Sequence, residues 1–329
     1  MLTKKRLAGL TVLMSVIYFI LLLLLPESVV GSRADSMLLF APKLVFLATT
    51  AAIATAMVLI LIFKRDFVKW QKLSFSKYKY LLFNHVKRDF VSRYRKSFLG
   101  ILWSLLNPLL TMMVLTIVFS QLFRFQIPNY PVYLLSGQII YLFFNESTTR
   151  AMGSVIGAEG IIKKVYVPKY IFPVSSVLSS LVNLLFSFIA FLLVFLFHVI
   201  FLDAPFHWTI LLVPIPFFYV FVFALGVGML LSSMAVFFRD LTYLYGISLT
   251  LLMYLTPIFY PAAIIPEQLL PFMGLNPLYQ FITYFRSLAL DGVIPGLWTN
   301  AVCLGFALAA LCCGTYVFIS KQDRYILYM

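Results

Sequence analysis

The titratable side chains of this sequence are scattered in a pattern that does not favour catalysis. Eleven Asp and Glu residues are present, and nearly all of them stand at the ends of apolar stretches or in the loops between them. No two of these carboxylates are placed for acid–base chemistry or for binding a metal ion. His85, His198 and His207 share no ligand spacing with an acid or a cysteine, and all three cysteines fall within residues 297–319. We therefore expect no catalytic residues and no metal site.

The sequence also lacks a phosphate-binding motif for ATP. A P-loop follows the pattern G-x-x-x-x-G-K-[ST], in which backbone N–H groups of a glycine-rich turn cradle the phosphates. This pattern does not occur in the chain. We expect the chain to be no enzyme and to bind no cofactor of its own. If its activity depends on ATP and Mg²⁺, a partner chain must supply the ATPase site.

Glu146 and Arg150 stand out as a charged pair at the edge of an apolar stretch. They are four residues apart with the acid first, which is the favourable order for an ion pair on a helix. Ionisable groups at membrane depth are costly unless they are paired. Two roles remain open for this pair: structural pairing near the membrane surface, or transmission of motion to the loop that follows.

The elements that hold these residues are predicted from composition. Of the 329 residues, 63% are hydrophobic and only 11% are charged, whereas soluble domains carry roughly a quarter charged residues. Eight apolar stretches reach the roughly 18 residues that a helix needs to cross the bilayer core. They are residues 7–25, 44–63, 99–123, 132–149, 171–202, 208–238, 241–260 and 297–319. The sequence therefore predicts an all-α polytopic membrane protein with eight transmembrane helices.

The basic residues indicate the orientation, since Lys and Arg near the ends of spans stay on the cytoplasmic side. With the amino terminus inside, 21 of the 25 Lys and Arg residues fall on the cytoplasmic side, and both termini are cytoplasmic. The first stretch follows Lys4, Lys5 and Arg6 and is longer than the apolar core of a signal peptide. We interpret it as a retained transmembrane helix.

The chain divides at a basic segment. Residues 1–63 predict a transmembrane hairpin, residues 64–77 a polar cytoplasmic linker, and residues 78–329 a core of six spans. The core begins with residues 79–98, which are too charged to span but amphipathic on a helical projection, so a helix in the membrane surface is predicted. Either anionic membrane lipids hold this basic helix at the surface, or the helix contacts a partner or an anionic headgroup at the mouth of a channel.

Two loops of the core carry apolar residues that are costly to leave in water. The cytoplasmic loop 158–169 combines a short amphipathic stretch with Pro168 and is followed by Pro173, and it either docks on another protein or dips its isoleucines into lipid. The external segment 261–296 holds five prolines and apolar runs that are too short to cross, such as Leu278–Leu290. We expect re-entrant external helices in this segment and a candidate outer gate.

Four separated motifs resemble the type-2 ABC transporter permeases of the Wzm and TarG type, which export polysaccharides, O-antigens and teichoic acids. The first is R-Y-R-K-S-F-L-G-I-L-W (93–103) followed by N-P-L (107–109). The second runs from Glu146 through E-G-I-I-K-K (159–164) to Pro168 and Pro173. The third is F-R-D-L (238–241), and the fourth is N-P-L (276–278) with Y-F-R (284–286). The motifs follow the family order, and the similarity covers residues 78–329.

The resemblance implies the transmembrane subunit of an ATP-driven exporter. Two copies of the chain would form a homodimer, bind two copies of a separate ATPase subunit, and move a lipid-linked glycan outward across the bacterial cytoplasmic membrane. No nucleic-acid partner is expected. The third and seventh spans would form the channel wall, and the hairpin 1–63 would be an accessory element, since it departs from the usual six spans of the family.

The resemblance also implies roles for individual residues. It places ATPase coupling on the turn that holds Glu159, Gly160, Ile161, Ile162, Lys163 and Lys164. It places the interfacial gate helix and its contact with an anionic substrate headgroup on Arg93, Tyr94, Arg95 and Trp103. It places the external gate on Asn276, Pro277 and Arg286.

Aromatic residues are concentrated in and beside the stretch 241–260. Aromatic rings offer flat surfaces to sugar faces and Tyr hydroxyls form hydrogen bonds, so Tyr245, Tyr254 and Phe259 are the candidate channel lining. An interfacial aromatic belt gives the same enrichment. Two other functions also remain open. One is a type-2 ABC permease for a small lipid or drug, and the other is a membrane-embedded transferase or scaffold, although such enzymes normally cluster acids or histidines in the membrane.

Overall fold

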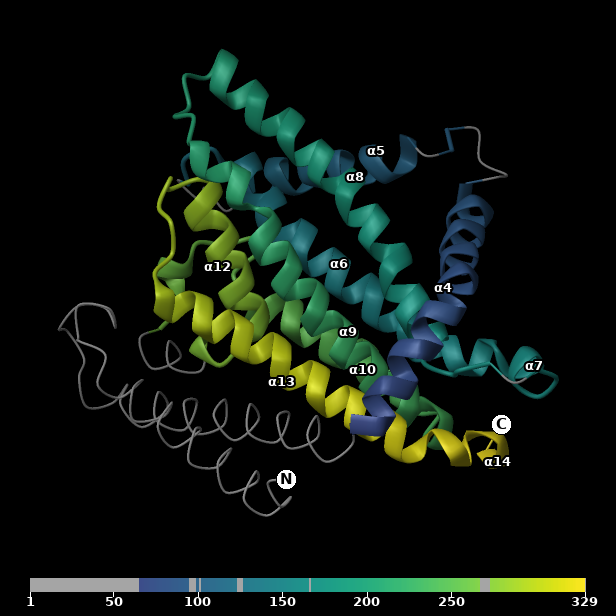
Figure 1. The fold of residues 1–329 in the computed structure, drawn as a ribbon. Helices are drawn as coiled ribbons and strands as arrows, with labels where there is room; N and C mark the ends of the chain where they lie inside the picture. Colours follow the sequence, from purple (N-terminus) through teal and green to yellow (C-terminus); the bar gives the residue numbers. More distant parts are fainter. Residues whose placement is uncertain are drawn as a thin grey trace, which may run out of the picture.

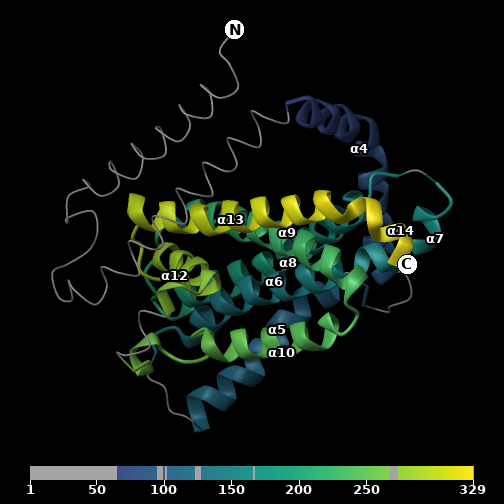
Figure 2. The same cartoon turned by 90° about the horizontal axis from the view of Figure 1, so that it is seen from below.

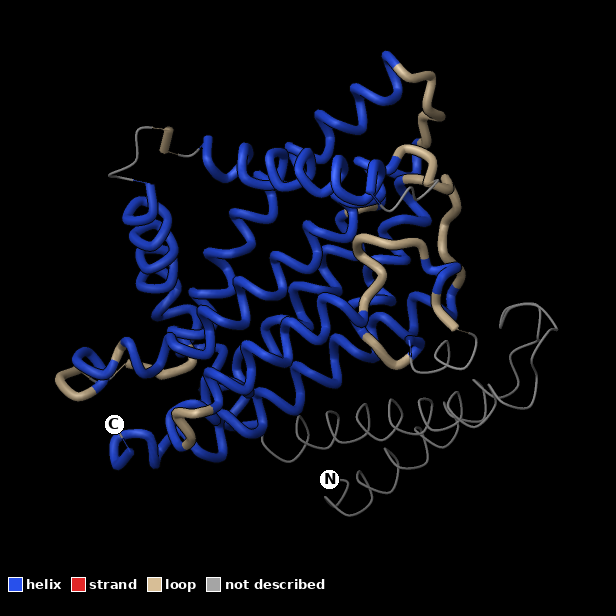
Figure 3. The backbone as a smooth tube through the Cα atoms, turned by 180° about the vertical axis from the view of Figure 1, so that it is seen from behind, coloured by secondary structure: helices blue, strands red, loops and turns tan. Residues whose placement is uncertain are grey.

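The computed structural model describes residues 65–94, 99–100, 102–122, 127–165, 167–266 and 273–328. Within residues 65–94, only the side chains of residues 78–92 are described. Within residues 102–122, the side chains of residues 121 and 122 are not described. All regular structure in these ranges is helical, as predicted (Figure 3). The predicted spans 7–25 and 44–63, and with them the hairpin 1–63, lie outside the described residues.

The principal helices include one for each of the six predicted apolar stretches after residue 98, together with α4 and α12, which lie outside those stretches. They are α4 (Arg65–Tyr94), α5 (Leu102–Ile117), α6 (Tyr130–Gly157), α8 (Ile171–Phe201), α9 (Pro214–Phe237), α10 (Leu241–Leu255), α12 (Pro277–Ala289) and α13 (Leu297–Lys321). The shorter ones are η1 (Val118–Leu122), α7 (Glu159–Ile162), η2 (Trp208–Leu212), η3 (Ala262–Ile264), η5 (Gln322–Arg324) and α14 (Tyr325–Tyr328).

Four described segments are long and apolar enough to cross a membrane. They are Leu102–Ser120, Ile171–Phe201, Trp208–Phe237 and Leu297–Tyr328. The predicted fourth span coincides with α6. The predicted seventh span coincides with α10, which has 15 residues because the backbone turns into an extended conformation at Thr256, directly before Pro257.

Helix α6 lies at the centre of the bundle, packed against both α8 and α9. It begins at Tyr130 after Asn129, whose backbone is left-handed, and Pro131 occupies the first turn, where a missing N–H is tolerated. Most of the helix is buried. The ends of α6 therefore have fixed positions, one on the side of α12 and the other next to α7.

Helices α9 and α13 make the closest approach in the bundle, at two glycines. A Cβ added at Gly226 would overlap the backbone of Ala310 and Leu311, and one added at Gly314 would overlap the backbone of Gly226. Small residues allow helix backbones to come this close in a membrane, where packing rather than hydrophobic burial drives association. The contact anchors α13 along its length to the central helices.

The helices form layers with two distinct ends. Figure 2 shows α13 along one side, α9, α8 and α6 in the middle, and α5 and α10 along the opposite side. In Figure 1, α4, α7, α14 and the carboxyl terminus gather at one end, and α12 lies at the other. The first group contains the segments predicted to be cytoplasmic, and α12 belongs to the predicted external segment.

Helix α4 is longer than the sequence predicted. It begins at Arg65 and runs without a break through most of the predicted linker 64–77. Residues 79–94 of the predicted amphipathic segment 79–98 form its carboxyl-terminal part, and α4 contacts α8, whereas residues 95–98 lie outside the described residues. The basic and polar residues of 65–77 are compatible with a helix because Lys, Arg and Gln have high helix propensity.

Candidate functional site

The predicted docking turn forms the short helix α7 directly after α6. Lys163 Nζ donates a hydrogen bond to Glu159 Oε1 at 2.6 Å across one turn. Ile161 is 38% exposed and Ile162 only 7%. The sequence treated the two isoleucines alike, whereas the structure separates them. The outward positions of this turn are Gly160, Ile161, Lys163 and Lys164.

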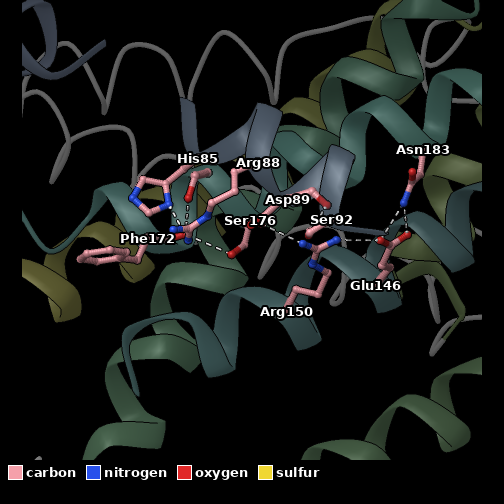
Figure 4. Close-up of polar contacts among 10 residues, drawn as sticks. His85, Arg88, Asp89, Ser92, Glu146, Arg150, Phe172, Ser176 and Asn183 are labelled. Atoms are coloured by element: carbon pink, nitrogen blue, oxygen red, sulfur yellow. Dashed lines mark hydrogen bonds and ion pairs between the residues drawn. The ribbon is translucent and has the colours of Figure 1, made fainter. Parts of the chain in front are cut away.

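A polar network joins α4, α6 and α8 near the end of the bundle where α7 lies (Figure 4). Arg150 of α6 donates through Nη2 to Asp89 Oδ2 of α4 at 2.9 Å and through Nη1 to Glu146 Oε1 at 3.4 Å. Asn183 of α8 donates through Nδ2 to both carboxylate oxygens of Glu146, at 2.8 and 3.0 Å. Arg150 thus lies between two carboxylates, one on its own helix and one on α4.

The charges in this network are partly exposed, which limits their contribution to stability. The side chains of Arg150, Asp89 and Glu146 are 28%, 27% and 32% exposed. Ion pairs with this degree of exposure contribute about 0.5–1 kcal/mol each. Their main effect is therefore geometric, because they fix the rotation of α4 relative to the end of α6 from which α7 emerges.

A second contact holds α4 on α8. The His85 ring lies edge-on to Phe172 with the ring centroids 5.7 Å apart, and its Nδ1 is 3.3 Å from Arg88 Nη2. Burial, together with the neighbouring Arg88 charge, lowers the pKa of His85, and Asp89 opposes this shift. Of the four residues predicted to act at the gate, the structure describes the side chain of one. The side chains of Arg93 and Tyr94 and all of Arg95 lie outside the described residues, and Trp103, at the start of α5, is 45% exposed.

Arg286 organises the opposite end of the bundle. Its side chain is 8% exposed, and the guanidinium lies 3.5 Å from the ring centroid of Tyr133. It donates four hydrogen bonds: Nε to Ser136 Oγ (3.2 Å), Nη1 to Pro257 O (2.7 Å), Nη2 to Tyr133 O (3.2 Å) and Nη2 to Ile258 O (3.1 Å). A planar fork of donors suits such a set of diverging carbonyls. Arg286 therefore ties α12 to both α6 and the turn that follows α10.

Asn276 and Pro277 start the same helix. Asn276 Oδ1 accepts hydrogen bonds from the backbone N–H groups of Leu278 at 3.0 Å and Tyr279 at 3.4 Å, which is the geometry of an N-cap. Pro277 occupies the first turn of α12. The Asn276 amide also donates to Thr256 Oγ1 at 2.8 Å. The N-P-L motif therefore joins the start of α12 to the end of α10.

Two tyrosines of α6 complete this anchor. Tyr130 donates its hydroxyl to Phe259 O at 2.7 Å, and Tyr133 donates to Tyr260 O at 3.0 Å. With Arg286, these side chains satisfy carbonyls of four consecutive residues, 257–260. Neither tyrosine has a role that could be predicted from the sequence, because the partners of both lie more than a hundred positions away in the chain.

The three predicted channel residues do not share one environment. Tyr245 donates its hydroxyl to Thr148 Oγ1 of α6 and so faces its own bundle. Phe259 stacks on Phe119 with the centroids 5.7 Å apart. Tyr254 is 64% exposed on the outer surface of α10. Only Tyr254 of the three is largely free to meet a substrate or a second chain.

Comparisons with known proteins match the part of the chain that carries these features. The sequence profile of the family described as ABC-2 type transporter matches residues 80–290, from within α4 to the end of α12. The chain belongs to the ABC-2 type transporter family. The resemblance inferred from the four motifs is thereby confirmed.

This ABC-2 type chain is similar to curated export and transport proteins over most of their length. It is 35% identical over 208 residues to an O-antigen export system permease protein RfbA of Klebsiella pneumoniae, covering 63% of this chain and 79% of the relative. It is 27% identical over 251 residues to the protein of the same name in Myxococcus xanthus, covering 76% and 95%. It is 23% identical over 252 residues to the polysialic acid transport protein KpsM of Escherichia coli, covering 72% and 91%.

Proposed function

We propose that this chain is the transmembrane subunit of an ATP-driven exporter that moves a lipid-linked polysaccharide, such as an O-antigen or a teichoic-acid-type polymer, outward across the bacterial cytoplasmic membrane. The observation that carries the proposal is the similarity to O-antigen export permeases over most of those proteins' length. ATP and Mg²⁺ act through a separate ATPase subunit, because the chain has no P-loop pattern.

The ATPase subunit docks on α7. This turn lies at the same end as α4 and the carboxyl terminus (Figure 1), and its outward surface combines apolar Ile161 with two lysines. Exposed apolar side chains beside charges are typical of a protein interface. Movement of α7 reaches the surface helix through Arg150, since this residue precedes α7 on α6 and binds Asp89 of α4.

The chain works as a homodimer whose interface involves the side formed by α5 and α10. In α10 the single buried residue is Leu249, and one side of the helix is exposed within the described part of the chain. The exposed apolar side chains of the two helices are Leu102, Trp103, Leu110, Met113, Val114 and Ile117 on α5, and Tyr243, Leu244, Ile247, Leu251, Tyr254 and Leu255 on α10. A second copy facing this side would enclose Tyr254 between the protomers, where it can contact the glycan.

The remaining parts of the proposal concern the membrane arrangement. The core crosses the bilayer six times. Four of these spans are the segments that are long and apolar enough by themselves, and α6 and α10 are the other two. The hairpin 1–63 adds two spans, and both termini are cytoplasmic. Arg93 and Arg95 bind the anionic headgroup of the substrate at the cytoplasmic mouth.

The test is deletion of the chromosomal gene followed by complementation with a tagged chain. We expect the deletion strain to lose a surface polysaccharide and to accumulate its lipid-linked form in the inner membrane. The tagged chain should restore export and should co-purify, after mild cross-linking, with a protein that carries a P-loop. Export of an unchanged polysaccharide by the deletion strain would contradict the proposal, and a changed phospholipid or drug profile would favour a small-lipid or drug permease.

A matched pair of variants tests the docking surface. Ile161→Asp places a charge on the outward side of α7 and should abolish co-purification with the ATPase while membrane insertion is normal. Val293→Asp is the control, since this residue is 58% exposed at the opposite end of the molecule. Loss of the ATPase in the control, or retention in Ile161→Asp, would refute the assignment of α7.

A further inference from the structure

The last residues of the chain fold back against the end of the bundle. After α13 ends at Lys321, the turn η5 (Gln322–Arg324) leads into α14 (Tyr325–Tyr328). Tyr325 is fully buried, whereas Leu327 in the same short helix is 80% exposed. The burial of Tyr325 shows that specific contacts hold this segment against the bundle.

Tyr325 enters a hydrophobic cluster that also contains the inner side of α7. Its ring lies edge-on to Phe318 with the centroids 5.5 Å apart and to Phe237 at 5.8 Å. The same cluster includes Ile162 of α7 and Phe172 of α8. The carboxyl terminus and the docking turn therefore share one small core, which is separate from the main core of the bundle.

A lysine in the loop after α7 makes the second contact. Lys169 Nζ donates a hydrogen bond to the backbone carbonyl of Gln322 and lies 5.5 Å from the ring centroid of Tyr325. This position is partly buried, and burial lowers the pKa of Lys169. The ammonium thus binds a carbonyl and an aromatic face, both supplied by the terminal segment. The carboxyl-terminal segment therefore contacts the loop after α7 directly through Lys169, and it shares a hydrophobic cluster with Ile162 of α7.

Helix α7 needs such support. It has only four residues, and isolated helices of this length are unstable because too few hydrogen bonds offset the cost of ordering the backbone. Its orientation must come from tertiary contacts. Ile162 provides one by inserting into the hydrophobic cluster to which Tyr325 also belongs.

We propose that residues 322–328 form a clamp that holds α7 in the orientation required by its ATPase partner, with Tyr325 and Lys169 as positioning residues. The inference rests on the proposed function, in which α7 receives the ATPase. Without the clamp, Ile162 loses a wall of its binding cluster and α7 moves independently of α6. ATP hydrolysis is then no longer linked to movement of the transmembrane helices.

The experiment follows the motion of α7 directly. Cys303, Cys312 and Cys313 are replaced by alanine, and Lys164→Cys, at an exposed position beside α7, carries a nitroxide spin label. Electron paramagnetic resonance spectra of the purified full chain in lipid nanodiscs are compared for Tyr325→Ala, Tyr325→Phe, Lys169→Gln and the control Leu327→Ala. Polysaccharide export is measured in cells for the same four variants in the natural cysteine background.

We expect the label to become more mobile in Tyr325→Ala and Lys169→Gln, with loss of most export at normal amounts of protein in the membrane. Tyr325→Phe keeps the ring contacts and should restore both signals, and Leu327→Ala should match the natural chain. If Tyr325→Ala fails to insert, Lys169→Gln alone decides, because Lys169 contributes no buried ring. An unchanged spectrum with full export in Lys169→Gln, or in an inserted Tyr325→Ala, would overturn the clamp.

These outcomes separate the clamp from the proposed function. If Ile161→Asp abolishes export but the clamp variants change neither readout, the docking role of α7 stands and the clamp is wrong. If Tyr325→Ala makes the label more mobile while Ile161→Asp leaves export intact, residues 322–328 do hold α7, but α7 does not receive the ATPase. In that case both the docking role of α7 and the positioning of α7 for the ATPase are refuted.

Discussion

Replacing Gly137 by alanine tests whether Arg286 holds together the end of the bundle that contains α12 in the way its hydrogen bonds indicate. Gly137 lies on α6 beneath the guanidinium. A Cβ added there would lie 2.9 Å from Arg286 Nη2 and 3.2 Å from Ile258 Cγ2. A flexible arginine would normally move aside at little cost. Here Nη2 donates to two carbonyls, at 3.2 and 3.1 Å, and the side chain is buried. The methyl group therefore competes with those bonds.

The magnitude follows from two opposing contributions. Alanine in a helix interior is more stable than glycine by about 0.5–1 kcal/mol. Breaking one hydrogen bond of a charged donor to a buried carbonyl costs about 1.5–3 kcal/mol. The net expectation for Gly137→Ala is a destabilisation of about 1–2 kcal/mol. For Gly153→Ala on the same helix, where an added Cβ meets nothing within 4 Å, only the favourable contribution remains.

The assay compares thermal unfolding midpoints of both variants with the natural chain in lipid nanodiscs. We expect Gly137→Ala to unfold a few degrees lower, at roughly 2–4 °C per kcal/mol for a chain of a few hundred residues, and Gly153→Ala to unfold at the same temperature or slightly higher. Export should fall in Gly137→Ala only. If both variants shift in the same direction, the guanidinium is not fixed against Gly137 and the role of Arg286 as an anchor of α12 is wrong.

Three further predictions concern the rest of the molecule. Asp89→Asn removes a charge that Arg150 binds, so export should fall while the free energy of unfolding changes by less than about 1 kcal/mol. Asp89→Glu keeps the negative charge, and failure of this variant to restore export would contradict the prediction. Gly226→Ala should prevent stable insertion because the methyl overlaps the α13 backbone, whereas Gly246→Ala, with free space around it, should accumulate normally in membranes. The lowered pKa of His85 means that the folded chain binds fewer protons than the unfolded chain below pH 6.5. The unfolding midpoint should therefore fall more steeply with decreasing pH in the natural chain than in His85→Gln. Equal dependence of the midpoint on pH in the two proteins would show that His85 is not buried against α8.

The sequence by itself determined where the long helices lie. The predicted stretches 171–202 and 297–319 correspond to α8 (Ile171–Phe201) and α13 (Leu297–Lys321). Helix bounds could be read because a membrane requires long apolar runs, and prolines and charges interrupt them. The family could also be inferred, since its motifs are short and local. The four-residue spacing of Glu146 and Arg150 likewise indicated a contact that depends only on helical geometry.

The tertiary structure decided which residues meet across the bundle. Asp89 reaches Arg150 over 61 positions, and Tyr133 provides a carbonyl and a ring for Arg286 over 153. Ile161 and Ile162 are neighbours of the same type, yet one faces outward and the other joins Tyr325 in a buried cluster. Periodicity reports which face of a helix is apolar, but not which partner covers that face. That choice depends on how the helices pack, and packing is set by contacts such as Gly226 against Gly314 that have no signature in local sequence.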